Sequence, residues 1–420
     1  MNSEELKLIQ AGRRKFAAMA STYFLGVFND NFFKQAALLM AISAGLIDFQ
    51  GYATVIFTLP FLIFASYAGW LSDRFSKRSV MIGSKVLELI AMLAGAAGIC
   101  TGSWVLIFTM LGIMGIQAAV FSPALNGSIP ELYPAWYVIK ANAIVKMIST
   151  TAIFGGIAMA GLVLSRRGAE VSSIPWGQFL VALSVVSVSI LGLIVSFGAP
   201  SRPAAAPEKK FPRSGPLETF RTIQEIQKDP LLNIAVMSNM FLWFCGSMMT
   251  MIVNPLGLKQ YCAGEAVTSF MNVVFLTGIA AGGFISSRLA VGERWYRVLS
   301  PAALIMSVMM GLMVLVPHLP VGHDLQVMAI FINLAGIGLC GGVFLIPLES
   351  FVQVRPAADR KGSVISAANF SVFSGILVSG LVANFLNAWL LPTQSFAVMS
   401  IMSLSVSIWQ YFVLNKGRLK

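Results

Sequence analysis

Ionisable and amide side chains interrupt otherwise apolar stretches of the chain, and their types and spacing point to a binding site. Asp30 lies between Asn29 and Asn31, and Lys34 follows four positions later. Residues four apart share one face of a helix, so this carboxylate and this ammonium group can pair. Charged groups inside a membrane are costly and usually face a cavity or a partner. If this stretch crosses a membrane, we expect Asp30, Asn31 and Lys34 to bind a substrate.

Further polar residues lie within apolar runs or at their ends. The remaining candidate substrate-binding residues are Asn126, Asn142, Lys146 and Glu349. Lys85 and Glu88 are three positions apart and also share a helix face. For this pair, a functional role and a self-neutralised packing role both stay open.

The chain has no residue pattern typical of a metal site or a catalytic centre. Its four cysteines have no zinc-type spacing, and it has two histidines. No nucleophile–base constellation is visible, so we predict a protein that is not an enzyme and needs no cofactor. The net charge of +12 is compatible with nucleic-acid binding, but the basic residues cluster in short loops between apolar runs. Because that distribution is typical of a membrane protein, we expect no nucleic-acid partner.

Composition identifies the elements that must position these residues. Hydrophobic residues make up 57% of the chain and charged residues 11%, and the mean hydropathy is +0.80. A soluble fold of this length cannot bury so much apolar surface. The apolar runs are continuous rather than alternating, which predicts helices and excludes a barrel. With about 20 residues per crossing, the chain has twelve predicted transmembrane helices: 16–46, 52–71, 79–100, 103–125, 141–164, 176–197, 231–254, 267–287, 298–316, 325–347, 363–388 and 395–415.

Basic residues orient these helices. With the N-terminus in the cytoplasm, most Lys and Arg residues fall in cytoplasmic segments, and the outer loops hold Arg166, Arg167 and Lys259. The positive-inside rule therefore predicts a multi-pass inner-membrane protein with both termini in the cytoplasm.

The longest polar stretch, 198–230, separates two sets of six predicted helices. It starts as a proline- and alanine-rich linker. Apolar residues then recur at every third position and predict a short helix on the inner membrane surface: Leu217, Phe220, Ile223 and Ile226. We expect an N-terminal six-helix half, 1–197, a cytoplasmic linker, 198–230, and a C-terminal half, 231–420. The ends of runs 103–125 and 325–347 are similar, as pseudo-symmetric halves would require.

The loop between the second and third predicted helices carries a recognisable pattern. Residues 69–78 read GWLSDRFSKR and resemble the loop signature of the major facilitator superfamily, in outline G-x-L-x-D-R-x-G-R-R. The chain departs from that signature at Ser76, where glycine is usual, and at Lys77. The resemblance implies a gating motif made of Gly69, Asp73, Arg74, Lys77 and Arg78.

The residue types in this loop suit a gate. Gly69 would let another helix approach closely, and Asp73 would meet the positive end of the following helix. The basic side chains would pair with carboxylates or helix C-termini when the inner gate closes. A plain cytoplasmic anchor is the alternative interpretation, but it explains neither the glycine nor the aspartate.

Several segments resemble the lysophospholipid transporter (LplT-like) family within this superfamily. They include an Asn-Asp-Asn signature in the first helix, a Ser-Pro-Ala series at the end of the fourth helix and a Lys-Ala-Asn series in the fifth. The matching segments, in chain order, are 27–31, 121–124, 127, 131–132, 140–142, 341–344 and 347–348.

The resemblance implies transport of lysophospholipids, chiefly lysophosphatidylethanolamine, from the outer to the inner leaflet of a bacterial inner membrane by alternating access. It also implies membrane lipids and a cytoplasmic lysophospholipid acyltransferase as partners, and a monomer. Two basic positions of the family are occupied here by Leu125 and Thr250. A headgroup phosphate therefore needs another cation, for which Lys34 and Lys146 are the candidates. Asp30 would attract the headgroup ammonium.

Two other classes of function stay open. Proton-coupled drug or small-metabolite antiporters of this superfamily usually carry an arginine in the fourth helix and a Gly-Pro pair in the fifth. Residues 103–125 contain no arginine, and no proline accompanies Gly155 and Gly156. A non-transporting sensor or enzyme would show a soluble domain or a catalytic centre, and neither is visible in the sequence.

Overall fold

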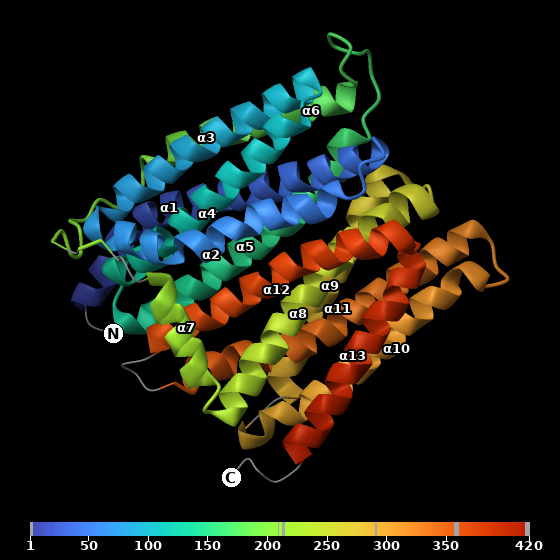
Figure 1. Ribbon diagram of the computed structural model, residues 1–420. Helices are drawn as coiled ribbons and strands as arrows, with labels where there is room; N and C mark the ends of the chain where they lie inside the picture. Colours follow the sequence, from blue (N-terminus) through green and yellow to red (C-terminus); the bar gives the residue numbers. More distant parts are fainter. Residues whose placement is uncertain (1–2, 209, 212–214, 290–291, 357–360, 416–420) are drawn as a thin grey trace. The chain divides into compact units, whose positions relative to one another are not determined.

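The computed structural model describes residues 3–208, 210–211, 215–289, 292–356 and 361–415 (Figure 1). Within these ranges the regular structure is helical, apart from one isolated bridge between Val171 and Ile174. The helices are α1 (Ser3–Ser43), α2 (Phe49–Arg74), α3 (Lys77–Thr101), α4 (Trp104–Leu132), α5 (Ala135–Leu164), α6 (Trp176–Ser196), α7 (Gly215–Ile226), α8 (Pro230–Pro255), η1 (Leu256–Gln260), α9 (Gly264–Leu289), η2 (Gly292–Val298), α10 (Leu299–Leu315), η3 (Val316–His318), α11 (His323–Val354), α12 (Lys361–Trp389) and α13 (Pro392–Asn415).

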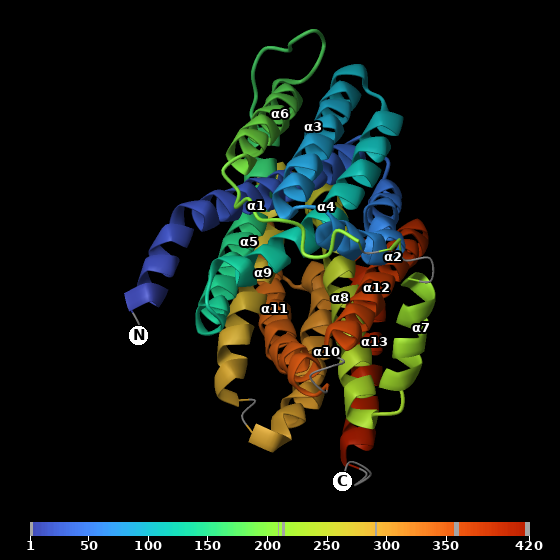
Figure 2. The ribbon, with the colours of Figure 1, turned by 90° about the vertical axis from the view of Figure 1, so that its left-hand side faces the viewer.

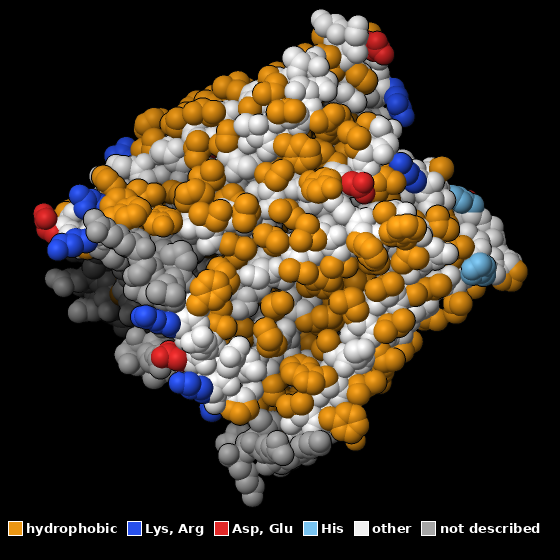
Figure 3. Space-filling view, viewed as in Figure 1, with side chains coloured by type: hydrophobic (Ala, Val, Ile, Leu, Met, Phe, Trp, Pro, Cys, Tyr) orange, Lys and Arg blue, Asp and Glu red, His pale blue; other side chains and the backbone are white. Residues whose placement is uncertain are grey.

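Most of the long helices are suited to a membrane. Among the described residues, ten are long and apolar enough to cross one, or eleven if the two pieces of α2, Phe49–Phe64 and Tyr67–Arg74, count as one bent span. The polar residues at 29–31, 34 and 35 lower the mean hydropathy of α1, which is not among the ten. Hydrophobic side chains cover most of the face in Figure 3, and charged side chains lie toward helix ends. The twelve-span count stays a prediction.

Local sequence sets several helix ends. Ser76 caps α3, where its Oγ accepts a hydrogen bond from the Ser79 backbone N–H at 3.2 Å. Gly102 ends that helix with a φ of 65°, a left-handed conformation that glycine adopts without strain. Asp229 caps α8 by accepting hydrogen bonds from two backbone N–H groups at 3.1 and 3.2 Å. Each cap stabilises its helix by about 1 kcal/mol.

Contacts divide the chain into two compact units. Unit one comprises Met1–Leu38 and Ile56–Pro216, and unit two comprises Leu39–Val55 and Leu217–Lys420. In unit one, α3 packs against α4 and α6, which lie beside it in Figures 1 and 2. In unit two, α9 packs against α11, α10 against α13, and α8 against α12. The predicted division at 197/198 and 230/231 stays a prediction.

A chain of buried amides holds the start of α2 within unit two. Gln50 Nε2 donates a hydrogen bond to the Met251 carbonyl oxygen at 3.1 Å. Asn254 Nδ2 donates to Gln50 Oε1 at 3.0 Å, and Asn272 Nδ2 donates to Asn254 Oδ1 at 2.9 Å. All three amide side chains are at most 1% exposed. The bonds join α2, α8 and α9, which explains why the contacts assign residues 39–55 to unit two.

The predicted helix in the polar stretch forms as α7. Ile226 is buried in the core of unit two, and Ile223 packs against that core. The ring of Phe220 lies 5.6 Å from the ring of Phe370. The described apolar side chains of α7 therefore pack on unit two. Its location on a membrane surface stays a prediction.

Candidate functional site

The polar residues in the middle of α1 make contacts within unit one. Asp30 accepts hydrogen bonds from Nε2 of Gln117 on α4, at 3.1 and 3.4 Å to its two carboxylate oxygens. Asn29 donates to the Val185 carbonyl oxygen on α6 at 3.0 Å. Asn31 donates to the backbone of its own helix, at Val27. Asp30 and Asn29 thus tie α1 to its neighbours, whereas the amide of Asn31 is used locally.

Gln117 is absent from the residues predicted from the sequence. It is buried, and it is the only glutamine in α4, a helix otherwise dominated by apolar residues. A buried amide in such a helix needs a hydrogen-bonding partner. A lone glutamine in an apolar helix was therefore the signal in the sequence that pointed to a buried polar contact. In the structure, Asp30 is its hydrogen-bonding partner.

Lys34 does not form the ion pair with Asp30 that their spacing permits. Its Nζ lies 5.2 Å from the centroid of the Phe57 ring, and no ion pair among the described residues joins it to Asp30. The two charges do attract each other electrostatically. The long lysine stem lets the ammonium group reach an aromatic face, which stabilises a cation. The predicted pairing is wrong at the level of contact.

Lys85 and Glu88 form a buried ion pair on α3. Lys85 Nζ lies 2.6 Å from Glu88 Oε2, and both residues are 1% exposed. The ammonium group also lies 5.6 Å from the centroid of the Phe121 ring. The other carboxylate oxygen, Glu88 Oε1, is buried without a hydrogen-bond partner among the described residues. The pairing that their spacing suggested is confirmed.

Glycine allows this ion pair to lie against α1. A Cβ built on Gly26 would come within 2.5 Å of Lys85 Nζ and 3.3 Å of Glu88 Oε2. Gly26 precedes Asp30 by four residues, so the pair contacts the same face of α1, one turn away. The charged groups that act electrostatically on Asp30 are Glu88, Lys85 and Lys34. We call Asp30, Lys34, Lys85, Glu88 and Gln117 the polar cluster of unit one.

The other predicted substrate-binding residues lie outside this cluster. Asn126 on α4 is exposed, and its amide lies 3.5 Å from Ser122 Oγ. Asn142 and Lys146 on α5 are exposed as well. Glu349 is half-buried on α11 of unit two. The structure therefore brings Asp30 and Lys34 together with residues of α3 and α4, while Asn126, Asn142 and Lys146 lie on open faces of unit one.

The motif between α2 and α3 is a network of polar contacts. Lys77 forms an ion pair with Glu131 of α4. Arg78 Nη2 donates a hydrogen bond to the Phe197 carbonyl oxygen at 2.6 Å. The Arg74 guanidinium lies 5.5 Å from the centroid of the Trp70 ring. Lys77 and Arg78 thus reach the partner types expected, a carboxylate and a carbonyl near a helix C-terminus.

The expectation for Gly69 in this motif needs correction, whereas that for Asp73 stays open. A Cβ built on Gly69 meets no heavy atom within 4 Å in the described part of the chain, so no close helix approach requires glycine there. The N-terminus of α3 is capped by Ser76, three residues nearer to the helix than Asp73, and the meeting of Asp73 with this helix end stays a prediction. Ser76 is where the chain departs from the superfamily signature, and its hydroxyl supplies a cap that glycine could not.

The start of the linker packs on this motif. The Ala206 backbone N–H donates to the Asp73 carbonyl oxygen at 2.8 Å. The ring of Phe211 lies 5.1 Å from the Tyr67 ring and 5.2 Å from the Trp70 ring, both on α2. These contacts fix the linker along the end of α2 within unit one.

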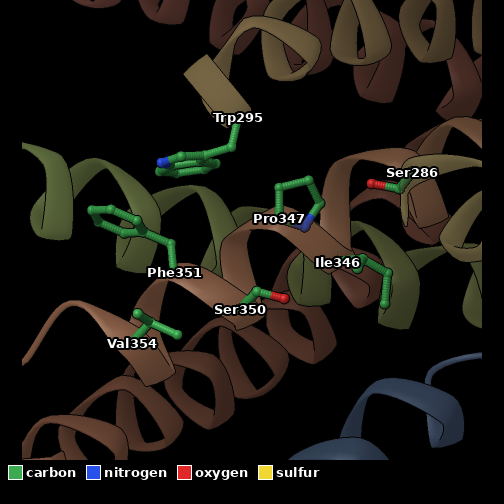
Figure 4. Close-up of a pocket in the computed structure, with 7 residues that line it drawn as sticks. All are labelled: Ser286, Trp295, Ile346, Pro347, Ser350, Phe351 and Val354. Atoms are coloured by element: carbon green, nitrogen blue, oxygen red, sulfur yellow. The ribbon is translucent and has the colours of Figure 1, made fainter. Parts of the chain in front are cut away.

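Each unit also has an open cleft near one end of its helices. The cleft in unit two has a volume of about 330 Å³ and lies between α9, η2 and α11. Figure 4 shows Trp295 and Phe351 side by side on one side of it and Ser286 on the other. Their two rings stack at 4.5 Å. The cleft in unit one, about 320 Å³, lies beside the motif and is lined by Phe75 and Ser84 among others.

Comparison with known proteins identifies the family. The sequence profile described as Major Facilitator Superfamily matches residues 16–380. The chain belongs to the major facilitator superfamily. Two relatives named "Lysophospholipid transporter LplT" are each 26% identical to it. The protein from Enterobacter sp. (strain 638) matches over 347 residues, 80% of each chain, and the one from Escherichia coli (strain SE11) over 374 residues, 86% of each.

Solved structures of other transporters have the same fold. A D-xylose-proton symporter superposes with a TM-score of 0.71 over 96% of this chain and 99% of its own, at 14% identity. A bacterial homologue of the human lysosomal transporter Spinster superposes with a TM-score of 0.70 over 96% and 95%, at 12% identity. The predicted major facilitator fold and the predicted LplT-like membership are confirmed.

Proposed function

We propose that this chain moves lysophospholipids from the outer to the inner leaflet of a bacterial inner membrane by alternating access. The observation that carries this proposal is the match to lysophospholipid transporters over 80–86% of the chain. The polar cluster of unit one adds physical support, because charged groups within a membrane-spanning bundle usually serve a substrate or an ion.

The headgroup of a lysophospholipid such as lysophosphatidylethanolamine carries an ammonium group and a phosphate, and both need partners in the site. Asp30 is the half-buried carboxylate of the cluster, and among the described residues its hydrogen-bond donor is a neutral amide. It is the partner we assign to the ammonium group. Lys34 is held on an aromatic face rather than by a carboxylate, which leaves its charge available to the phosphate. Lys146, exposed on α5, is the second candidate.

Several further expectations are part of this proposal. Both termini lie in the cytoplasm, and the protein acts as a monomer. A cytoplasmic acyltransferase consumes the delivered lysophospholipid. The contacts of Lys77 and Arg78 close the cytoplasmic side of unit one in part of the cycle.

The test is uptake of labelled lysophosphatidylethanolamine by proteoliposomes that contain the purified chain. We expect uptake by the wild type, loss of most uptake in Asp30→Asn, and normal uptake in Asp48→Asn, which changes an exposed carboxylate in the loop after α1. Normal uptake by Asp30→Asn would reject the role of Asp30. Absence of lysolipid uptake by the wild type, with uncoupler-sensitive transport of a water-soluble compound, would favour a proton-coupled antiporter instead.

A further inference from the structure

The cleft in unit two has mainly apolar walls. The rings of Trp295 and Phe351 stack on one side of it (Figure 4), and Val354, which also lines it, is 75% exposed. Its volume of about 330 Å³ lies within the range of ligand pockets, about 300–1,000 Å³. The remaining lining residues are Ser286, Ile346, Pro347 and Ser350. The cleft is therefore large enough to hold part of a ligand.

The buried hydroxyl group of the cleft is already hydrogen-bonded within the protein. Pro347 has no backbone N–H, so the Val343 carbonyl oxygen, four residues earlier in α11, lacks its usual helical donor. Ser286 Oγ on α9 donates to that oxygen at 3.2 Å. Ser350, the other serine of the cleft, is exposed. Because the buried wall uses its hydroxyl donor internally, hydrocarbon fits that wall better than a polar ligand does.

Each of the three elements around the cleft carries an arginine near it in the sequence. On α11, the Arg355 guanidinium lies 5.9 Å from the centroid of the Phe351 ring. Arg288 of α9 and Arg297 of η2 are exposed, and the ion pairs among the described residues include neither of them. Glu349, on the same part of α11, is half-buried. The resulting positive charge complements a phosphate group.

Arg355 is held beside the cleft and still has donors for an anion. Its Nε donates to Asp229 Oδ2 at 2.9 Å, and the other oxygen of Asp229 accepts from the first turn of α8. A guanidinium group has five N–H donors, so its Nη groups can bind a phosphate while the bond to Asp229 persists. The Arg355 side chain is 48% exposed, which leaves it accessible to a ligand.

We propose that this cleft binds a diacyl phospholipid with an anionic headgroup from the surrounding bilayer. One acyl chain lies in the cleft against Trp295 and Val354, and the phosphate binds Arg355. A tryptophan beside arginines is typical of the depth at which headgroups meet acyl chains. The occupant is a lipid rather than a peptide because the chain is a membrane protein, whose exposed apolar side chains face hydrocarbon. This site does not rest on the proposed lysolipid transport, since the bound lipid stays in place.

The test measures by native mass spectrometry which lipid the purified full chain retains from micelles containing equal amounts of phosphatidylglycerol and phosphatidylcholine. The wild type should retain phosphatidylglycerol in preference. Arg355→Gln should weaken this binding about tenfold, because it removes a charge-assisted hydrogen bond. Ser350→Trp should weaken it at least as much, because the indole ring fills the cleft. Arg221→Gln, which removes an exposed arginine of α7 in the same unit, is the matched control and should bind like the wild type.

A second measurement separates lost binding from a damaged fold. Phosphatidylglycerol should raise the Tm of the wild type and of Arg221→Gln, but not that of Arg355→Gln or Ser350→Trp, because a ligand stabilises only a fold that binds it. Equal retention of both lipids by the wild type, or equal retention of phosphatidylglycerol by all four proteins, would overturn the proposal. Displacement by equimolar lysophosphatidylethanolamine would also overturn it and assign the cleft to the substrate. If the wild type moves no lysolipid but retains phosphatidylglycerol, the proposed function fails and the lipid site stands.

Discussion

The amide chain of unit two predicts a large and uneven sensitivity to substitution. Asn254 donates to Gln50 and accepts from Asn272, so Asn254→Leu removes two hydrogen bonds at once. Leucine has the same branched arrangement of four side-chain heavy atoms, so the change leaves no cavity. The change leaves Gln50 Oε1 in the interior without this donor, which costs about 1–3 kcal/mol. Asn272 Nδ2 loses one of its two bonds and keeps the one to the Thr268 carbonyl oxygen at 3.2 Å. With about 0.5–1.5 kcal/mol for the second bond, we expect a loss of about 1.5–4.5 kcal/mol in the free energy of unfolding.

Asn272→Leu is the matched control at the end of the chain. It removes the bonds to Asn254 Oδ1 and to the Thr268 carbonyl oxygen, and it removes Asn272 Oδ1, which has no partner in the described structure. Its cost should lie near the lower end of about 1–3 kcal/mol. The double variant Gln50→Leu/Asn254→Leu should cost less than the sum of its single variants by about 0.6–1.7 kcal/mol, the range measured for hydrogen bonds between membrane helices.

The assay is equilibrium unfolding in mixed micelles with increasing denaturing detergent, followed by circular dichroism. A cost for Asn254→Leu no greater than that for Asn272→Leu would refute the reasoning. So would strict additivity in the double variant. Either result would mean that α2 is held to α8 and α9 by apolar packing alone.

Three further predictions concern the linker, a helix cap and a helix crossing. Phe211→Ala removes a ring that packs on two aromatic rings of α2, so limited proteolysis of the linker should be several-fold faster, and cleavage at the wild-type rate would exclude this packing. Asp229→Ala should lower unfolding free energy by about 1–2 kcal/mol, measured in the same micelles, and Asp229→Asn, which keeps a capping acceptor, should recover most of it. Gly156→Ala places a Cβ 2.6 Å from the Phe28 carbonyl oxygen and should reduce the yield of monodisperse protein, whereas Gly83→Ala, where a Cβ meets no atom within 4 Å, should not.

The features predicted correctly from the sequence depend on local spacing. The pairing of Lys85 with Glu88 follows from their three-residue separation on one helix. The helix α7 follows from apolar residues at regular intervals, and Ile223 and Ile226 do face the core of unit two. The helices themselves could be predicted from the long apolar runs, because a run that crosses lipid must form its backbone hydrogen bonds within itself.

The contacts that could not be predicted join residues far apart in the chain. Gln117 lies 87 positions from Asp30, and their hydrogen bond depends on how α1 and α4 pack. Lys34 shows the same limit, since spacing placed it near Asp30 but could not reveal the competing ring of Phe57. At Gly69 the error is the opposite one, a contact that was predicted but not found. The motif match predicted a close helix approach there, and the described contacts do not contain one.

The burial of the cluster argues for two separate roles within it. If Lys85 and Glu88 were only a packing feature, apolar residues of similar volume would serve as well, since a buried ion pair often adds no net stability. Their position one turn from Asp30 supplies a reason to retain them. Lys85 and Glu88 hold a positive and a negative charge at fixed places beside Asp30. We infer that these charges set the affinity of the Asp30 carboxylate for cations although the pair itself does not contact the cation. Two single variants separate the two views: opposite changes in the apparent KM for lysophosphatidylethanolamine in Glu88→Gln and Lys85→Met would show that the pair acts on Asp30, and a KM equal to that of the wild type in both would leave packing as the role of the pair.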